Sequence, residues 1–216
     1  MLEIVIIGAG GFGRELAQLL GDCVSPDEYR LKGFLGRATT TADAAGLAAP
    51  LLGDPQLYVP QRDDRLVLAI GEIEARRRTV ESLASRGGQF LTIRHPTACV
   101  AASARIGQGA VLYPYSVVSH AAVLDDFVHL NYYASMGHDA RAGRFCLLAP
   151  YATLNGGSVL EDEVYLSTHV TIAPQVRVGC RSKVSANSAV MKDVPPGRFV
   201  FGVPGRQMPR LDGQSG

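Results

Sequence analysis

The stretch LNYYASMGHDARAGRFCL, residues 130–147, contains the pattern that decides the fold. It consists of three hexads, and the same six-residue period runs without insertion from Val100 to Pro195. The first position of every hexad is apolar, and the fifth is always Ala, Ser, Cys or Val. One large and one small buried side chain per step suit the walls and corners of a triangular coil of short strands. The period therefore predicts a β-solenoid with three hexads per turn and slightly more than five turns, of unspecified handedness.

The residues before the hexads follow a different pattern. EIVIIGAGG, residues 3–11, is an apolar strand that ends in glycines, and FGRELAQLL, residues 12–20, is a helical stretch. Further strands are predicted at residues 29–36, 49–53 and 65–71, a helix at 72–87, and a last strand at 89–94. Strands that alternate with helices predict a small parallel α/β sheet.

The glycines after the first strand match the G-x-G-x-x-G pattern of phosphate-binding loops. Gly8, Gly10 and Gly13 would let a phosphate approach the backbone N–H groups at a helix N-terminus. An NAD site also needs an acidic residue after the second strand, where this chain has Gly36 and Arg37. A complete dinucleotide fold is also longer than this segment. A nucleotide or nucleotide-sugar phosphate is therefore favoured over NAD, with a purely structural glycine turn as the alternative.

Composition limits the classes of partner and the compartment. The 216 residues carry a formal net charge of +1 with scattered basic residues, which argues against nucleic acid and against a membrane surface. The four cysteines form no C-x-x-C pair, so we expect buried free thiols in a reducing compartment. The N-terminal stretch resembles neither a signal peptide nor a membrane span. We therefore expect a cytoplasmic protein.

Two histidines lie on one edge of the predicted solenoid. An 18-residue turn stacks residue i on residue i+18, so His120 and His138 share an edge with Gly156. Asp139 directly follows His138, and an imidazole beside a carboxylate is suited to general-base catalysis near neutral pH. The glycines at 156 and 157 would leave room for a thin linear group against bare backbone. The competing interpretation is that these histidines are ordinary solvated surface groups.

The order of motifs along the chain resembles a known family. IVIIGAGGFGRE at residues 4–15, the hexads, N-x₆-H-D from Asn131 to Asp139, two glycines at 156–157, and GVPGR at 202–206 follow one another. This order is similar to that of the sialic acid O-acetyltransferase (NeuD) family and the bacterial nucleotide-amino-sugar N-acetyltransferases. The resemblance implies a Rossmann-like nucleotide-sugar-binding domain at 1–94, a left-handed parallel β-helix acyltransferase domain at 95–197, and a C-terminal closure and tail at 198–216.

The resemblance also implies acetyl-CoA as co-substrate, a nucleotide sugar as acceptor, and a homotrimer with active sites between subunits. In this family the His of the H-D pair is the general base, which places that role on His138, with Asp139 as its carboxylate. We predict that the substrate-binding residues are Gly8, Gly10, Gly11, Gly13, Arg37, Gly71, His120 and Asn131. We predict that the coenzyme-binding residues are Asn155, Gly156, Gly157 and Ala186, and we expect no metal site.

Several functions remain open at this stage. The favoured one is acetyl transfer to the amino group of a nucleotide-linked amino sugar; the alternatives are O-acetylation of a sialic acid-type sugar and a non-catalytic nucleotide-binding β-helix protein. Some family members carry a second His nine residues after the base, where this chain has Leu147. A metal-dependent hydratase of the γ-carbonic anhydrase class needs an H-x₄-H pair, which the spacing of His120, His129 and His138 does not supply.

Overall fold

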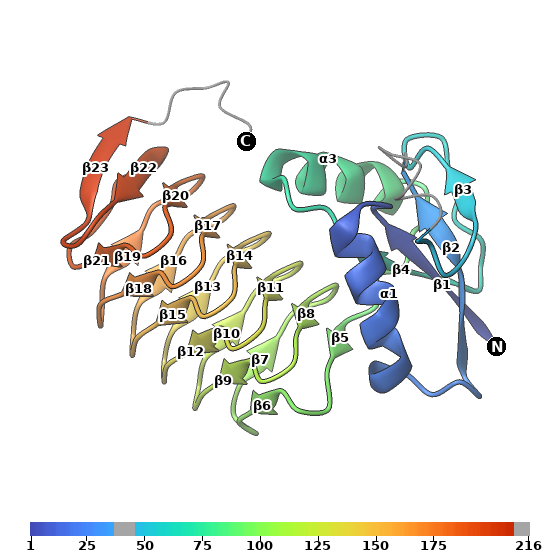
Figure 1. Ribbon diagram of the computed structural model, residues 1–216, viewed down its shortest axis with the longest axis horizontal. Coiled ribbons are helices and arrows are strands. Elements are labelled where there is room, and N and C mark those ends of the chain that lie inside the picture. The colour runs from blue at the N-terminus through green and yellow to red at the C-terminus, as the bar shows by residue number, and fades with distance from the viewer. Residues whose placement is uncertain (37–45, 210–216) are drawn as a thin grey trace. The chain divides into compact units, whose positions relative to one another are not determined.

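A computed structural model describes residues 1–36 and 46–209 of the chain (Figure 1). The chain divides into two compact units, Met1–Ile93 and Arg94–Gly216, and each is described separately below.

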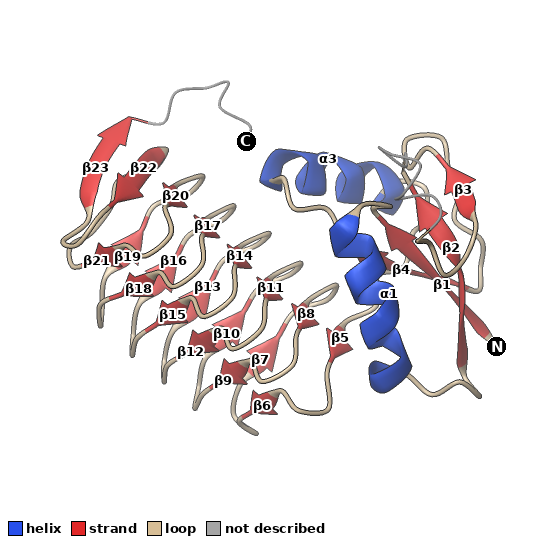
Figure 2. Ribbon diagram, in the orientation of Figure 1, coloured by secondary structure: helices blue, strands red, loops and turns tan. Residues whose placement is uncertain are grey.

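The first unit is built on a four-stranded parallel sheet with the strand order β3-β2-β1-β4 (Figure 2). Its elements are β1 Leu2–Ile7, α1 Gly11–Cys23, β2 Tyr29–Leu35, β3 Leu51–Gly53, β4 Asp64–Leu68 and α3 Ile73–Ala84. The second half of β1 is fully buried, as expected for a central parallel strand. Helix α1 buries Gly13, Leu16 and Leu20, which recur at intervals of three and four residues and so form one apolar face.

The strand predicted at residues 89–94 is wrong as a single element. Phe90 pairs with Leu66 of β4 in an isolated parallel bridge. β5 Ile93–Arg94 instead joins a sheet of the second unit next to β8 Val111–Leu112. The reason is the hexad phase, because Arg94 stands six residues before Val100 and the small Ala98 occupies the buried fifth position. The repeat therefore begins one hexad earlier than its apolar first positions indicate.

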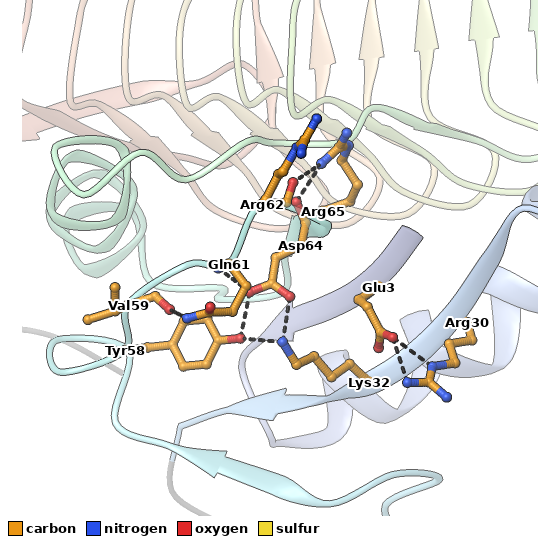
Figure 3. A network of polar contacts seen from close by, with 9 residues as sticks. All are labelled: Glu3, Arg30, Lys32, Tyr58, Val59, Gln61, Arg62, Asp64 and Arg65. Atoms are coloured by element: carbon orange, nitrogen blue, oxygen red, sulfur yellow. Dashed lines mark hydrogen bonds and ion pairs between the residues drawn. The ribbon is translucent and has the colours of Figure 1, made fainter. Parts of the chain in front are cut away.

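A buried carboxylate ties a loop to the sheet of the first unit (Figure 3). Asp64, 1% exposed, accepts hydrogen bonds from Lys32 Nζ at 2.6 Å, from the Tyr58 hydroxyl at 2.7 Å and from the Gln61 amide at 2.7 Å. Burial alone would raise the pKa of Asp64, but these three donors outweigh burial and hold the pKa below its usual value. The cluster joins β2, β4 and the segment between β3 and β4.

The second unit is a parallel β-helix whose three faces run along the coil axis (Figure 1). The first face comprises β5, β8, β11 His129–Leu130, β14 Leu147–Leu148, β17 Tyr165–Leu166, β20 Lys183–Val184, β22 Arg198–Phe201 and β23 Arg206–Pro209. The second comprises β6 Cys99–Val100, β9 Val117–Val118, β12 Ser135–Met136, β15 Thr153–Leu154, β18 Thr171–Ile172 and β21 Ala189–Val190. The third comprises β7 Arg105–Ile106, β10 Val123–Leu124, β13 Arg141–Ala142, β16 Val159–Leu160 and β19 Arg177–Val178.

The core of the β-helix consists of the residues that the period singles out. From residue 110 onward the first and fifth hexad positions are buried. Residues eighteen positions apart pair in register, as Met136 does with Leu154, except at the last turn, where Val184 pairs with Val200. Each buried first-position side chain contributes about 1.5–3 kcal/mol. The prediction of a left-handed parallel β-helix with three hexads per turn is confirmed.

The fourth hexad position turns the chain at each corner. Residues there have φ near +60°, among them Tyr133 at 57°, Asp139 at 58° and Gln175 at 62°. Non-glycine residues rarely adopt this left-handed region, so the coil imposes it through the hydrogen bonds between turns. The amide of Asp139, for example, donates to the carbonyl of His120 at 2.9 Å.

The cysteines are less buried than expected. Only Cys146 is buried among the four free cysteines, and Cys99 is exposed, so the expectation of four buried thiols is wrong. Cys99 is exposed because it stands at the outward-facing sixth hexad position. Within residues 1–36 and 46–209, the helices are too short or too polar to span a bilayer.

Candidate active site

His138 and Asp139 form a hydrogen-bonded pair at the corner between the second and third faces, which we call the His138 corner. Nδ1 of His138 lies 2.8 Å from Oδ2 of Asp139, and both side chains are well exposed at 69% and 64%. An ionised carboxylate can only accept, so Nδ1 carries the hydrogen and Nε2 presents its lone pair away from Asp139. The left-handed backbone at Asp139 turns the chain at this corner, where the carboxylate contacts the preceding ring. The Nε2 lone pair is therefore free to accept a proton, as a general base requires.

Bare backbone lies directly against the His138 ring. A Cβ placed on Gly156 would be 2.5 Å from Nε2 and 2.6 Å from Cε1 of His138. Any residue other than glycine at position 156 would therefore displace the imidazole. A Cβ on Gly137 would lie 2.8 Å from the backbone nitrogen of Gly156. Two successive turns thus approach each other closely through glycines at this corner. The prediction that bare backbone accompanies His138 agrees with this geometry.

A groove of about 680 Å³ runs from this corner across the second face. It spans four turns, from Val117 to Gln175, and includes three of the predicted residues, His138, Asn155 and Gly156. Ser135 and Thr153 were missed by the sequence reasoning, although both line the groove and their hydroxyls lie 3.1 Å apart. Both residues occupy the sixth hexad position, which points away from the core of the coil, and this position could have identified them. Polar residues at that position on one face mark a polar groove floor.

The other predicted residues of this corner have defined contacts. His120 lies one turn before His138, with Nδ1 2.9 Å from Oγ of Ser103. It is not among the residues that line the groove, although its neighbour Ser119 is. The Asn155 side chain donates to the carbonyl of Ile172 at 2.7 Å, which fixes its orientation between two turns.

Two predicted residues lie at a different corner. Asn131 and Ala186 follow β11 and β20, between the first and second faces, whereas His138 follows β12 at the far end of the second face. Asn131 Oδ1 accepts from the Tyr132 amide at 2.7 Å, and neither predicted residue lines the groove. This tyrosine corner carries the stacked, exposed rings of Tyr115, Tyr133, Tyr151 and His169. One chain therefore does not bring Asn131 or Ala186 together with His138.

The predicted phosphate-binding glycines gather in the first unit at the carboxyl ends of β1 and β4. A Cβ on Gly8 would collide with the Ala69 carbonyl and one on Gly13 with the Gly8 carbonyl, so both are glycines for packing reasons. A Cβ on Gly10 or Gly71 would meet nothing within 4 Å, so these two face open space. The neighbouring Gly11 begins α1. Arg37 lies outside the described residues.

This edge of the sheet is where open parallel sheets bind ligands. The strand order changes direction between β1 and β4, and such a switch point leaves a crevice at the carboxyl ends of the strands. The N-cap residue of α1, Gly10, has no side chain to satisfy the free amides of the first turn, and that turn contains no acidic residue. Positive potential at the helix start is therefore not neutralised by a capping group of α1.

Metal donors do not cluster in the described part of the chain. Among residues 1–36 and 46–209, no group of three or more His, Cys, Asp or Glu side chains is arranged to hold an ion.

The chain is similar in sequence to a known domain family and to a bacterial sugar N-acetyltransferase. Residues 3–83 match the PglD N-terminal domain. The GDP-perosamine N-acetyltransferase of Escherichia coli O157:H7 is 30% identical over 137 residues, which cover 62% of this chain and 61% of that protein. The chain spans about three-fifths of the length of this curated relative.

Two solved structures match this chain over nearly its whole length. The acetyltransferase domain of PglB from Neisseria gonorrhoeae FA1090 has a TM-score of 0.85 at 27% identity, covering 96% of this chain and 100% of that one. PerB from Caulobacter crescentus, solved in complex with CoA and GDP-perosamine, has a TM-score of 0.81 at 27% identity and covers 95% and 97%. The similarity includes both units of the fold.

Proposed function

We propose that this protein transfers an acetyl group from acetyl-CoA to the amino group of a nucleotide-linked amino sugar. The observation that carries the proposal is the His138–Asp139 pair, whose Nε2 lies against the Gly156 backbone at the edge of the groove. Support comes from the similarity to the GDP-perosamine N-acetyltransferase of Escherichia coli O157:H7 and to PerB, which was solved with CoA and GDP-perosamine. The acceptor that we propose is a UDP- or GDP-linked 4-amino sugar.

His138 acts as the general base in this reaction. As the neutral amine of the sugar attacks the thioester carbonyl carbon, Nε2 accepts the proton that the nitrogen loses. Asp139 holds the hydrogen on Nδ1 and stabilises the imidazolium that forms. The tetrahedral intermediate then expels CoA as a thiolate, and the imidazolium returns the proton to sulfur. One C–N bond forms and one C–S bond breaks, with no covalent enzyme intermediate.

The backbone of Gly156 is the candidate donor for the developing oxyanion. Within the described residues its N–H donates no hydrogen bond, and Gly156 lines the groove beside the His138 ring. A preorganised backbone donor at such a position stabilises negative charge without reorganisation. Asn155 and Gly157 flank this amide and are proposed to contact the pantetheine arm of the coenzyme.

A homotrimer would bring the two separated corners together. Asn131 and Ala186 occupy the tyrosine corner, so they can reach a coenzyme or substrate at His138 only if another copy supplies them. We therefore propose that the groove of one subunit is closed by the tyrosine corner of the next. Light scattering of the purified protein tests this arrangement, and a monomeric protein with full activity would contradict it.

The first unit is proposed to hold the diphosphate of the nucleotide. Gly10, Gly11 and Gly71 leave the backbone accessible at the switch point between β1 and β4, and the start of α1 attracts negative charge. In this arrangement Gly8 and Gly13 shape the loop rather than contact the ligand.

Release of free thiol from acetyl-CoA measures the proposed activity. The acceptors are UDP-, GDP- and dTDP-linked 4-amino sugars, with free sialic acids as the O-acetylation alternative. We expect turnover with at least one amino sugar, slowed about a hundredfold to ten-thousandfold in His138→Ala. Turnover with sialic acids alone would favour the O-acetyltransferase, and full activity of His138→Ala would exclude His138 as the base. No thiol release from any acceptor would favour the non-catalytic nucleotide-binding protein.

A further inference from the structure

His120 shares the corner of His138 but has a different hydrogen-bond partner. The amide of Asp139 donates to the His120 carbonyl, and Val118 pairs in register with Met136, so the two histidines leave the same corner on adjacent turns. Adjacent turns are about 4.8 Å apart. His120 is exposed, and the preceding residue Ser119 lines the groove. His120 thus flanks the proposed site on the side opposite to Gly156.

Ser103, one turn earlier, lies within hydrogen-bond distance of the His120 ring. Its Oγ accepts the amide hydrogen of Ala121 at 3.0 Å and lies 2.9 Å from Nδ1 of His120. A serine hydroxyl has one hydrogen to donate, and Nδ1 lies within its reach, whereas the ionised Asp139 beside His138 has none. We propose that Ser103 donates this hydrogen to Nδ1, so that Nε2 of His120 carries a hydrogen and donates it to an oxygen of the acceptor sugar.

The two stacked histidines then have opposite roles. Nε2 of His138 accepts a proton from the amine, whereas Nε2 of His120 donates a hydrogen bond one turn away. The coenzyme is proposed to lie along Asn155 and Gly156, on the following turn, which leaves the His120 side for the sugar. A sugar hydroxyl next to the reacting amine is the acceptor that fits this donor. This role rests on the proposed function, and Ser103 acts only through His120, as a positioning residue.

Nitrogen-15 NMR of the histidine side chains tests the hydrogen positions without any substrate. In the neutral form of both rings, we expect the hydrogen on Nε2 in His120 and on Nδ1 in His138. In Ser103→Ala, the Nδ1 resonance of His120 should move toward that of a free imidazole nitrogen, while His138 stays unchanged. A hydrogen on Nδ1 of His120 in the wild type would overturn the proposal, whether or not the protein is an acetyltransferase.

Kinetics test the contact with the sugar. His120→Ala should raise KM for the nucleotide sugar about tenfold, as expected for one lost hydrogen bond, while KM for acetyl-CoA is unchanged. Ser103→Ala should raise the same KM about twofold to threefold, and Ser103→Thr should restore it. Gln108→Ala is the matched control for His120→Ala, because Gln108 holds the same third hexad position at another corner. It should change neither KM.

An acceptor sugar without the hydroxyl next to the amine tests whether His120 contacts that hydroxyl. A substrate analogue lacking the hydroxyl next to the amine should bind wild type and His120→Ala equally well. An unchanged KM in His120→Ala, or an equal loss for substrate and deoxy analogue, would overturn the contact. If no amino sugar is acetylated by the wild type, the proposed function fails and this contact fails with it. The NMR result would still decide the hydrogen positions.

Discussion

The imidazole of His138 rests against the Cα of Gly156, where a Cβ would lie 2.5 Å from Nε2. The contact joins two successive turns of the β-helix and leaves the basic nitrogen at the edge of the groove. Because the ring is exposed and can rotate, a side chain at residue 156 would displace the ring rather than the coil.

Gly156→Ala should therefore abolish activity while leaving the fold intact. We expect kcat to fall at least about a hundredfold, the lower limit for losing a general base, with a small change in melting temperature. Gly137→Ala is the matched control, because its Cβ would meet the Gly156 backbone nitrogen at 2.8 Å, which cannot move without disturbing the coil. That variant should lose stability. An active Gly156→Ala enzyme would contradict the assigned position of the base.

Asp139→Asn tests the carboxylate without changing the backbone. Asn tolerates the left-handed conformation at φ 58°, so the corner should keep its shape. The loss of charge removes the stabilisation of the imidazolium, and kcat should fall, although less than in His138→Ala, for which we expect about a hundredfold to ten-thousandfold. Steady-state kinetics with saturating acetyl-CoA measures both. Equal activity of Asp139→Asn and wild type would show that the carboxylate only positions the ring passively.

Substitution of the loop glycines should separate binding from folding. Gly10→Ala places a methyl group in open space, so the protein should remain stable while a ligand approaching the loop is obstructed. KM for the nucleotide sugar should rise, with KM for acetyl-CoA unchanged. Gly13→Ala would collide with the Gly8 carbonyl and should lower the melting temperature instead. Unaltered nucleotide-sugar binding by Gly10→Ala would argue against a phosphate at this loop.

The buried Asp64 should make the first unit sensitive to acid. Because its pKa in the folded state lies below the usual value, its stabilisation is complete above the unfolded pKa of about 3.9 and is lost as the pH falls through the lower folded value. Lys32→Met should cost about 1.5–3 kcal/mol at neutral pH, because a charged hydrogen bond to the buried carboxylate is lost. Denaturant unfolding at several pH values measures both effects.

The exposed Arg78–Glu74 pair on α3 of the same unit is the control for this cluster. Arg78→Met should change stability little, because an exposed ion pair is screened by solvent. Asp64→Asn should remove the acid-dependent part of the unfolding curve. A wild-type curve that is flat from neutral pH down to about pH 3 would contradict the lowered pKa of Asp64.

The hexad period was sufficient to predict the β-helix because each step repeats the same burial requirement. First positions such as Met136 and fifth positions such as Ala140 are buried wherever the turns stack. The spacing of eighteen also placed His120 and His138 on one corner. The start of the coil escaped the pattern, because the first position there is held by Arg94, an exposed polar residue in the first turn of the stack.

Local patterns also determined the glycine loop, the His138–Asp139 pair and the α/β character of the first unit, since each depends on residues close in sequence or one turn apart. Only the tertiary structure showed that Gly8 and Gly13 are required for packing, that Ser135 and Thr153 line the groove, and that Asn131 does not. These facts depend on which face of the coil carries the groove and how closely neighbouring turns approach. A six-residue period repeats identically on all three faces, so it does not show which of them carries the groove.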